Sequence, residues 1–312
     1  MNPTELASSA LSVFSVRFLL VVLLPVTAGA LYLLCLVWSG APQGHPKFSG
    51  ISRSVGGLGV GAVVLLVLAV LVVAVLLQAA LPSAHRLWQG AVWFPLRSAR
   101  RQAHLSTKQG FDTTERDASA RLLALPTNQR QAVANVAFHA ARQRDLAYPP
   151  RDADVRATAL GNALLALWAH AGQEHGWRSD VAWPRLYAVL PDRARLLVDD
   201  ARNTLDQAIA LATVLVFASL ASIPLLAPAR WWSLLTLLPL TLAVLSYRSA
   251  VDAVPALRAA VQNAFDLHRF DLLQALHLPL PTDSAAEHLL AGQLCDAWRR
   301  DAPVHTPFQH GP

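Results

Sequence analysis

The amino-acid sequence predicts an all-α, polytopic membrane protein with two transmembrane helical hairpins and a helical cytoplasmic domain. Of its 312 residues, 54% are hydrophobic and only 15% are charged, whereas about 25% are charged in a typical soluble domain. The chain between the apolar segments shows helical periodicity and no convincing strand alternation. Four apolar segments contain no Asp, Glu, Lys, Arg or His, and they cover residues 18–38, 57–81, 208–226 and 231–247.

The first predicted hairpin covers residues 18–81, after a short cytoplasmic N-terminus at residues 1–17. Segment 18–38 has the length of one bilayer crossing and is too long for a signal-peptide core, so we expect a retained helix. A loop rich in Gly, Pro and Ser leads to the second span at 57–81. Gly57 and Gly61 have the GxxxG spacing that allows close helix packing. A flexible helix entrance explains the two glycines equally well.

Basic residues orient the hairpins. Asp112 is the first acidic residue after Pro82, and five basic residues precede it: Arg86, Arg97, Arg100, Arg101 and Lys108. Positive charge near span ends marks the cytoplasmic side. We therefore expect residues 82–207 to form a cytoplasmic helical domain whose membrane-surface basic cluster faces anionic lipid headgroups. Four crossings then place both termini in the cytoplasm.

Breakers divide the cytoplasmic domain into predicted helices. Thr113 or Thr114 caps a helix that ends at Ala124, and Thr127 or Asn128 caps a second helix that stops before Tyr148. Residues 154–171 are predicted to be helical, and residues 176–184 to be irregular. A helix that starts at Pro191 or Asp192 meets no breaker before Pro224, so one long helix is expected to continue into the third span.

The second predicted hairpin covers residues 208–247, with spans 208–226 and 231–247 joined by a short turn at 228–230. The C-terminal region, residues 248–312, is expected to be helical and cytoplasmic. Its apolar residues continue at helical spacing, with a kink expected at Pro255. Thr282 or Asp283 is expected to cap a final helix that ends at Arg300.

Four residues before the third span are candidates for a ligand or partner surface: Arg156, Asn162, Trp183 and Arg185. In one interpretation they line a pocket for an anionic ligand or partner. In the favoured interpretation, Trp183 and Leu186 fill the core of a small domain, and the arginines pair with Asp180 and Asp192.

His170, Glu174 and His175 are weak candidates for a metal site, because imidazole and carboxylate groups bind zinc or iron. Their spacing differs from the helical HExxH arrangement, and Gly172 and Gly176 argue against a rigid helix, so a solvated helix end is favoured. No GxSxG, P-loop or GxGxxG motif occurs, and we predict no catalytic residue, metal or cofactor.

Several motifs resemble an uncharacterised family of bacterial four-span membrane proteins. The similarity covers about the second half of the chain and rests on LGNALLA, WPRLYAVLP and DDARNTLD before the third span, and on AFDLHR after the fourth. The sequence departs from that family at His175-Gly176-Trp177, where an aromatic–Gly pair is expected. The resemblance implies the four-span architecture and no established activity.

The functional expectation is a non-enzymatic scaffold, sensor or effector, anchored in the bacterial inner membrane and acting through protein partners or as a homo-oligomer. An ion-coupled transporter is disfavoured by the lack of ionisable residues in the spans. The sequence lacks a stripe of basic residues with interleaved aromatic residues, so nucleic-acid binding is not expected. The alternatives are a homo-oligomeric channel or pore-forming effector in bacterial conflict and, third, a metal-dependent membrane hydrolase that uses His170 to His175.

Overall fold

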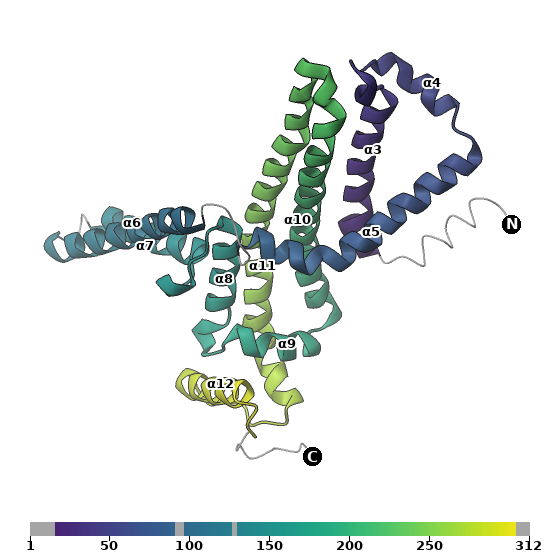
Figure 1. Ribbon diagram of the computed structural model, residues 1–312. Coiled ribbons are helices and arrows are strands. Elements are labelled where there is room, and N and C mark those ends of the chain that lie inside the picture. The colour runs from purple at the N-terminus through teal and green to yellow at the C-terminus, as the bar shows by residue number, and fades with distance from the viewer. Residues whose placement is uncertain (1–15, 91–96, 127–129, 304–312) are drawn as a thin grey trace. The chain divides into compact units, whose positions relative to one another are not determined.

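The computed structural model describes residues 16–90, 97–126 and 130–303, and all regular structure among them is helical (Figure 1). The all-α class is therefore confirmed. Two compact units are present: unit 1 contains residues 1–86 and 203–252, and unit 2 contains residues 87–202 and 253–312. The α-helices are α2 (Val16–Phe18), α3 (Leu24–Trp38), α4 (Ile51–Gly56), α5 (Val60–Trp88), α6 (Arg97–Ala124), α7 (Arg130–Ala147), α8 (Ala159–His170), α9 (Ser179–Val189), α10 (Asp192–Leu226), α11 (Leu237–Ala275) and α12 (Ser284–Arg299).

Four helical segments are long and apolar enough to cross a membrane, as the sequence predicts. They are Leu19–Trp38, Val60–Trp88, Asp192–Ala229 and Trp231–Ala275. The first combines the π-helical turn η1 (Leu19–Leu23) with α3. The last two combine α10 and α11 with the 3-10 segment η7 (Ala227–Thr236), which is longer than the expected turn at 228–230.

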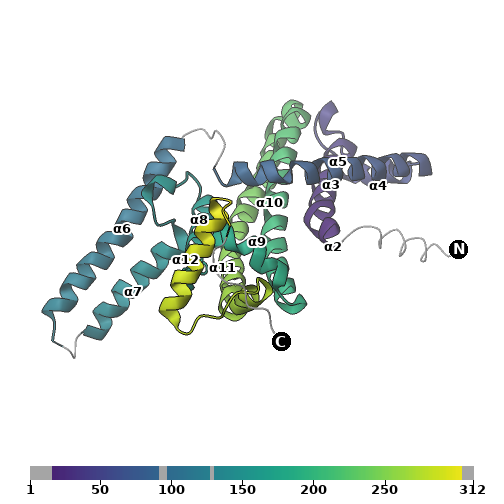
Figure 2. The ribbon, with the colours of Figure 1, turned by 90° about the horizontal axis from the view of Figure 1, so that it is seen from below.

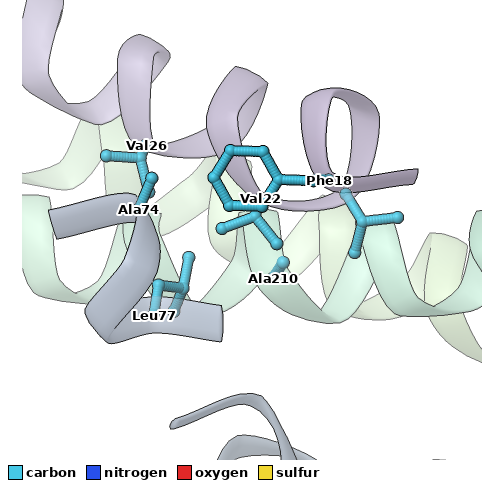
Figure 3. Packing of buried hydrophobic residues seen from close by; sticks show 7 residues of the cluster. Phe18, Val22, Val26, Ala74, Leu77 and Ala210 are labelled. Atoms are coloured by element: carbon cyan, nitrogen blue, oxygen red, sulfur yellow. The ribbon is translucent and has the colours of Figure 1, made fainter. Parts of the chain in front are cut away.

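Helix α10 is the central helix of unit 1. In the most apolar 18-residue stretch of α10, 50% of the residues are buried. The corresponding share is 33% in the first apolar helix, 22% in the α11 segment and 6% in α5. One cluster of buried side chains joins the first apolar helix to α5 and α10 (Figure 3). It consists of Phe18, Val21, Val22, Val26, Ala74, Leu77 and Ala210.

Gly29 marks the close approach of α3 to α10. A Cβ atom at this position would overlap the Val214 side chain. A larger residue here would force the Val214 side chain to move or the two helices to separate.

Hydroxyl groups in the apolar helices donate to backbone carbonyl oxygens. The Ser246 Oγ of α11 donates to Ala208 O of α10 at 2.8 Å, and Ser219 Oγ donates to Thr236 O at 2.9 Å. Thr213 Oγ1 donates within its own helix to Ile209 O at 2.7 Å. These polar groups are therefore satisfied without water, as an apolar environment requires.

Gly57 and Gly61 do not share a helical face, as GxxxG packing requires. Helix α5 begins at Val60, so Gly57 lies in the turn before it. Gly61 is exposed, and a Cβ atom there would meet nothing within 4 Å. Both glycines are therefore exposed at the entrance to α5.

In unit 2, α6 and α7 run side by side (Figure 2). Helix α6 begins at Arg97, so the expected cap at Thr113 or Thr114 is wrong: both hydroxyls donate to Gly110 O inside the helix. Its end at Ala124 agrees with the sequence. The caps expected for α7, Thr127 or Asn128, lie outside the described residues.

The sequence-based predictions for three further helices can be compared with the structure. Residues 176–184 were expected to be irregular, but α9 occupies Ser179–Val189, because its residues Ala182 and Leu186 are fully buried. Helix α10 runs without interruption from Asp192 to Leu226, as predicted. Asp283 caps α12, its side chain accepting from Ala286 N at 2.8 Å.

The packing at Gly29 predicts a mutation-sensitive contact. Gly29→Ala should lower the free energy of unfolding by about 1–3 kcal/mol, because the new methyl group overpacks the α3–α10 contact. Val214→Ala in the same chain should recover part of that loss by removing the overlapped atoms. Gly61→Ala is the matched control and should not destabilise. Thermal unfolding in detergent would measure all four proteins, and equal effects at Gly29 and Gly61 would contradict the packing.

Candidate functional site

Asn162 is a fully buried side chain that fixes the backbone at Arg156. Its Oδ1 accepts from Arg156 N at 2.6 Å, and its Nδ2 donates to Arg156 O at 3.1 Å. Thr158 caps α8 by accepting from Gly161 N at 3.2 Å, and a Cβ atom at Gly161 would overlap the Gln89 carbonyl. The Leu-Gly-Asn sequence therefore builds a tight corner in which both polar groups are satisfied internally.

The Arg156 side chain is half-buried and directed at Gln89. Its Nη1 donates to Gln89 Oε1 at 3.1 Å. Burial lowers the pKa of Arg156; the negative charge of Asp154 opposes this shift, and the positive charge of Arg97 adds to it.

Trp183 and Arg185 project from α9 into two different sets of contacts. Trp183 packs in an aromatic cluster, with ring centroids 5.9 Å from Trp168, 5.8 Å from Tyr187 and 6.1 Å from Phe265. Arg185 is exposed, and its guanidinium lies 4.4 Å above the Trp298 ring.

The four candidate residues therefore do not converge on one pocket. Asn162 contacts Arg156, whereas Trp183 and Arg185 make separate contacts within unit 2. Leu186 is fully buried, and Trp183 is half-buried in the aromatic cluster. The expected ion pairs are wrong: Asp180 pairs with Arg299 at 2.6 Å and Asp192 lies 4.0 Å from Arg195.

The three weak metal candidates, His170, Glu174 and His175, have separate surroundings. His170 Nε2 is buried and has no hydrogen-bond partner among the described residues. Glu174 has an exposed side chain, and its backbone carbonyl lies 2.7 Å from His288 Nε2. Within the described ranges, no three His, Cys, Asp or Glu side chains are grouped so that they could hold a metal ion.

His175 belongs instead to an ion-pair cluster with α11 and α12. Its Nε2 lies 2.9 Å from Asp266 Oδ1, and its Nδ1 lies 4.0 Å from Glu287 Oε1. The buried Glu287 carboxylate accepts from Arg269 Nε at 2.7 Å. Chain reversal at Gly172, where φ is 73°, presents His175 to this cluster. These contacts attach the turn around His175 to α11 and α12. Asp266 and Glu287 are more than 90 residues from His175 in the sequence, so local sequence patterns cannot reveal the cluster.

Arg101 and Lys108 direct their charges inward from α6. Arg101 donates to the carbonyl oxygens of Val155 and Asp152, both at 2.9 Å. The Lys108 ammonium is buried and lies 2.7 Å from both Pro150 O and Asp152 Oδ1. These two side chains therefore hold residues 150–155 against α6 and are not part of an exposed basic surface.

The other members of the predicted basic cluster are exposed. Arg86 lies in the last turn of α5, in unit 1. Arg97 and Arg100 lie in the first turn of α6, in unit 2. The exposed basic side chains farther along α6 and α7 are all arginines: Arg116, Arg121, Arg130 and Arg142. Arginine-rich surfaces of this kind attract anionic groups.

Unit 1 contains a charged cluster, Arg17–His85–Asp206, whose members are distant in the sequence. The nearly buried Asp206 carboxylate of α10 lies 2.6 Å from Arg17 Nη2 and 3.2 Å from His85 Nε2 of α5. Asp206 is the last acidic residue before the apolar part of α10. That position is the one local signal of its role, because Arg17 is 189 residues away.

An apolar groove lies between α3, α5 and α10 of unit 1. Its volume is about 620 Å³, within the range of small-molecule sites. All its lining side chains are apolar, from Val26 to Leu34 on α3, Leu66 to Ala80 on α5, and Val214 to Ala221 on α10. The groove can hold an apolar chain, but it presents no side-chain group for polar chemistry.

Comparisons with protein-family models, curated proteins and solved structures found no significant match to this chain.

The Asn162 corner predicts a loss of stability on substitution. Asn162→Ala should lower the free energy of unfolding by about 2 kcal/mol, because it leaves the buried Arg156 amide and carbonyl without partners. Asn263→Ala, at an exposed position of α11, should have little effect. Denaturant titration of both variants would test this, and equal stabilities would contradict the corner.

The half-buried His170 predicts acid sensitivity. Burial is the main cause that lowers the pKa of His170; Asp145 opposes it, and Arg258 adds to it. The unfolded chain therefore binds this proton more tightly, so stability should fall as the pH drops below about 6.5 towards the lower folded-state pKa.

His170→Gln should reduce that acid-induced loss, measured as the difference in unfolding midpoint between pH 7.5 and pH 5. Part of the loss should remain, because burial also lowers the pKa of His104. The exposed His139→Gln is the control. An unchanged pH dependence in His170→Gln would show that His170 is not held neutral.

Proposed function

We propose that this chain is a non-enzymatic, multi-pass protein of the bacterial inner membrane that acts as a scaffold, sensor or effector through protein partners or self-association. The proposal is supported by four helical segments that are long and apolar enough to cross a membrane. In unit 2, the candidate residue Asn162 bonds to the backbone of Arg156, and His175 lies 2.9 Å from Asp266.

The observation that best supports this function is that α10 is one continuous helix. This helix spans 35 residues, with its first turns in unit 2 and its apolar part in unit 1. Helix α11, with 39 residues, likewise belongs to both units. Between Asp192 and Ile223, α10 contains no proline, so its backbone hydrogen bonds fix each turn and resist bending, whereas Pro255 interrupts these bonds in α11. A partner that shifts unit 2 would therefore act on the spans mainly through α10.

The proposed orientation has both termini and unit 2 in the cytoplasm. Arg86, Arg97, Arg100 and Arg248 follow or precede the span ends on one side, and positive charge near span ends favours the cytoplasm. On this account the two hairpins are formed by spans 18–38 with 57–81 and 208–226 with 231–247. The exposed arginines of unit 2 then lie in the compartment where anionic lipid headgroups and acidic partners are available.

Cysteine labelling tests this orientation. In a chain with Cys35 and Cys295 replaced by alanine, Ser52→Cys should react with a membrane-impermeant maleimide in intact cells. Ser119→Cys should react only after permeabilisation. Both serines are exposed within their units, so burial does not interfere. The opposite labelling pattern would invert the topology.

Ion flux separates the scaffold or sensor from a homo-oligomeric pore. Hydroxyl residues could line a pore, but Ser219 and Ser246 donate to backbone carbonyls between the apolar helices. Purified chain in liposomes should therefore release no trapped ions above the level of empty liposomes. Reproducible conductance that scales with protein density would favour the pore-forming effector instead.

A further inference from the structure

The apolar groove of unit 1 combines a hollow surface with small side chains. Ala30 of α3, Ala69 of α5 and Ala221 of α10 line it, and none of them is fully buried. Its occupant must be apolar, because a polar group entering it would lose hydrogen bonds to water without replacement.

The groove suits a flexible chain better than another helix. An α-helix is about 10 Å across, whereas a hydrocarbon chain is only one methylene wide. The groove has a volume of about 620 Å³ and is lined by three helices, so a hydrocarbon chain can lie along it.

The three segments that surround the groove also carry the Arg17–His85–Asp206 cluster at one end. Ala80 of the groove precedes His85 by five residues on α5, which is about 7.5 Å along the axis. Val214 follows Asp206 by eight residues on α10, which is about 12 Å. An amphiphile with its chain in the groove would place its headgroup near this cluster.

The charge at this end of unit 1 favours an anionic headgroup. The Arg17 side chain is 54% exposed despite its ion pair with Asp206. Ser246 bonds to Ala208, so Arg248 and Asp252 follow on α11 at the same end. Three arginines, at positions 17, 86 and 248, thus stand against two aspartates, at positions 206 and 252. A guanidinium group with its five N–H donors suits phosphate oxygens.

We propose that the groove binds one acyl chain of an anionic phospholipid and that Arg17 binds the phosphate of that lipid. The inference rests on the proposed membrane placement of unit 1. It adds a defined lipid site, one per chain, to the general contact that every membrane protein makes with the bilayer.

Native mass spectrometry of the full-length chain tests the site. Delipidated protein receives dioleoyl phosphatidylglycerol, dioleoyl phosphatidylcholine or glycerol phosphate. Phosphatidylglycerol should bind with one lipid per chain and more tightly than phosphatidylcholine, and glycerol phosphate alone should not bind. Ala69→Phe should weaken phosphatidylglycerol binding about tenfold, because the ring excludes roughly two methylenes from the groove.

Two controls separate groove and headgroup. Ala79→Phe makes the same change on an exposed position of α5 that does not line the groove, and it should bind like the natural chain. Arg17→Gln should reduce the preference for phosphatidylglycerol over phosphatidylcholine, and Arg17→Lys should restore it. If Ala69→Phe binds as tightly as Ala79→Phe, or if a lipid-free dimer forms instead, the proposal is overturned.

The labelling of Ser52→Cys and Ser119→Cys distinguishes failure of this site from failure of the membrane placement. Labelling as expected without stoichiometric lipid would remove the lipid site alone. The opposite labelling pattern would move the Arg17 end to the outer face and remove the proposed topology, whether or not lipid binds.

Discussion

Unit 1 depends on the packing of its helices around α10. The first apolar helix meets α10 at Gly29 and Val214, α5 meets it through the cluster of Ala74 and Ala210, and α11 meets it through Ser246. In the proposed membrane placement, the hydrophobic effect supplies little attraction between apolar helices, so close contact and buried hydrogen bonds stabilise the packing. Small residues at these contacts are therefore a requirement of the fold.

The distribution of polar groups follows the same constraint. Inside the apolar helices, hydroxyl groups donate to carbonyl oxygens. The nearest buried charge, Asp206, lies before the apolar part of α10 and is paired with Arg17 and His85. A carboxylate one or two turns deeper would be much more costly. The ion cluster thus marks one boundary of the apolar zone and connects the first apolar helix, α5 and α10 there.

Local sequence patterns predict where the helices lie better than they predict which residues these helices contact. The lack of charge revealed the four apolar helices, and the lack of breakers revealed α10. Helix α6 was missed before Thr113 because its polar residues bind residues 150–155 through Arg101 and Lys108, a contact that propensity does not record. Helix α9 forms despite Pro184 because Ala182 and Leu186 are buried.

The candidate site was the least predictable part. His175 was recognised as unusual, but its partners Asp266 and Glu287 lie 91 and 112 residues away, so no spacing rule joins them. The sequence marks Asn162 as a candidate for a ligand or partner surface, and in the structure its amide bonds to the backbone of Arg156. Buried polar residues and ligand-binding residues share the same sequence signal, because both interrupt an apolar pattern.

The most direct test of the account is hydrogen–deuterium exchange along α10 in the full-length chain reconstituted in lipid nanodiscs. A continuous helix that supports unit 1 predicts slow exchange of backbone amides from the second turn of α10, across Asn203 to Gln207, and onward into the apolar part. Rapid exchange confined to Asn203 to Gln207 would reveal a hinge between the two halves. It would contradict both the central role of α10 and the coupling proposed through it.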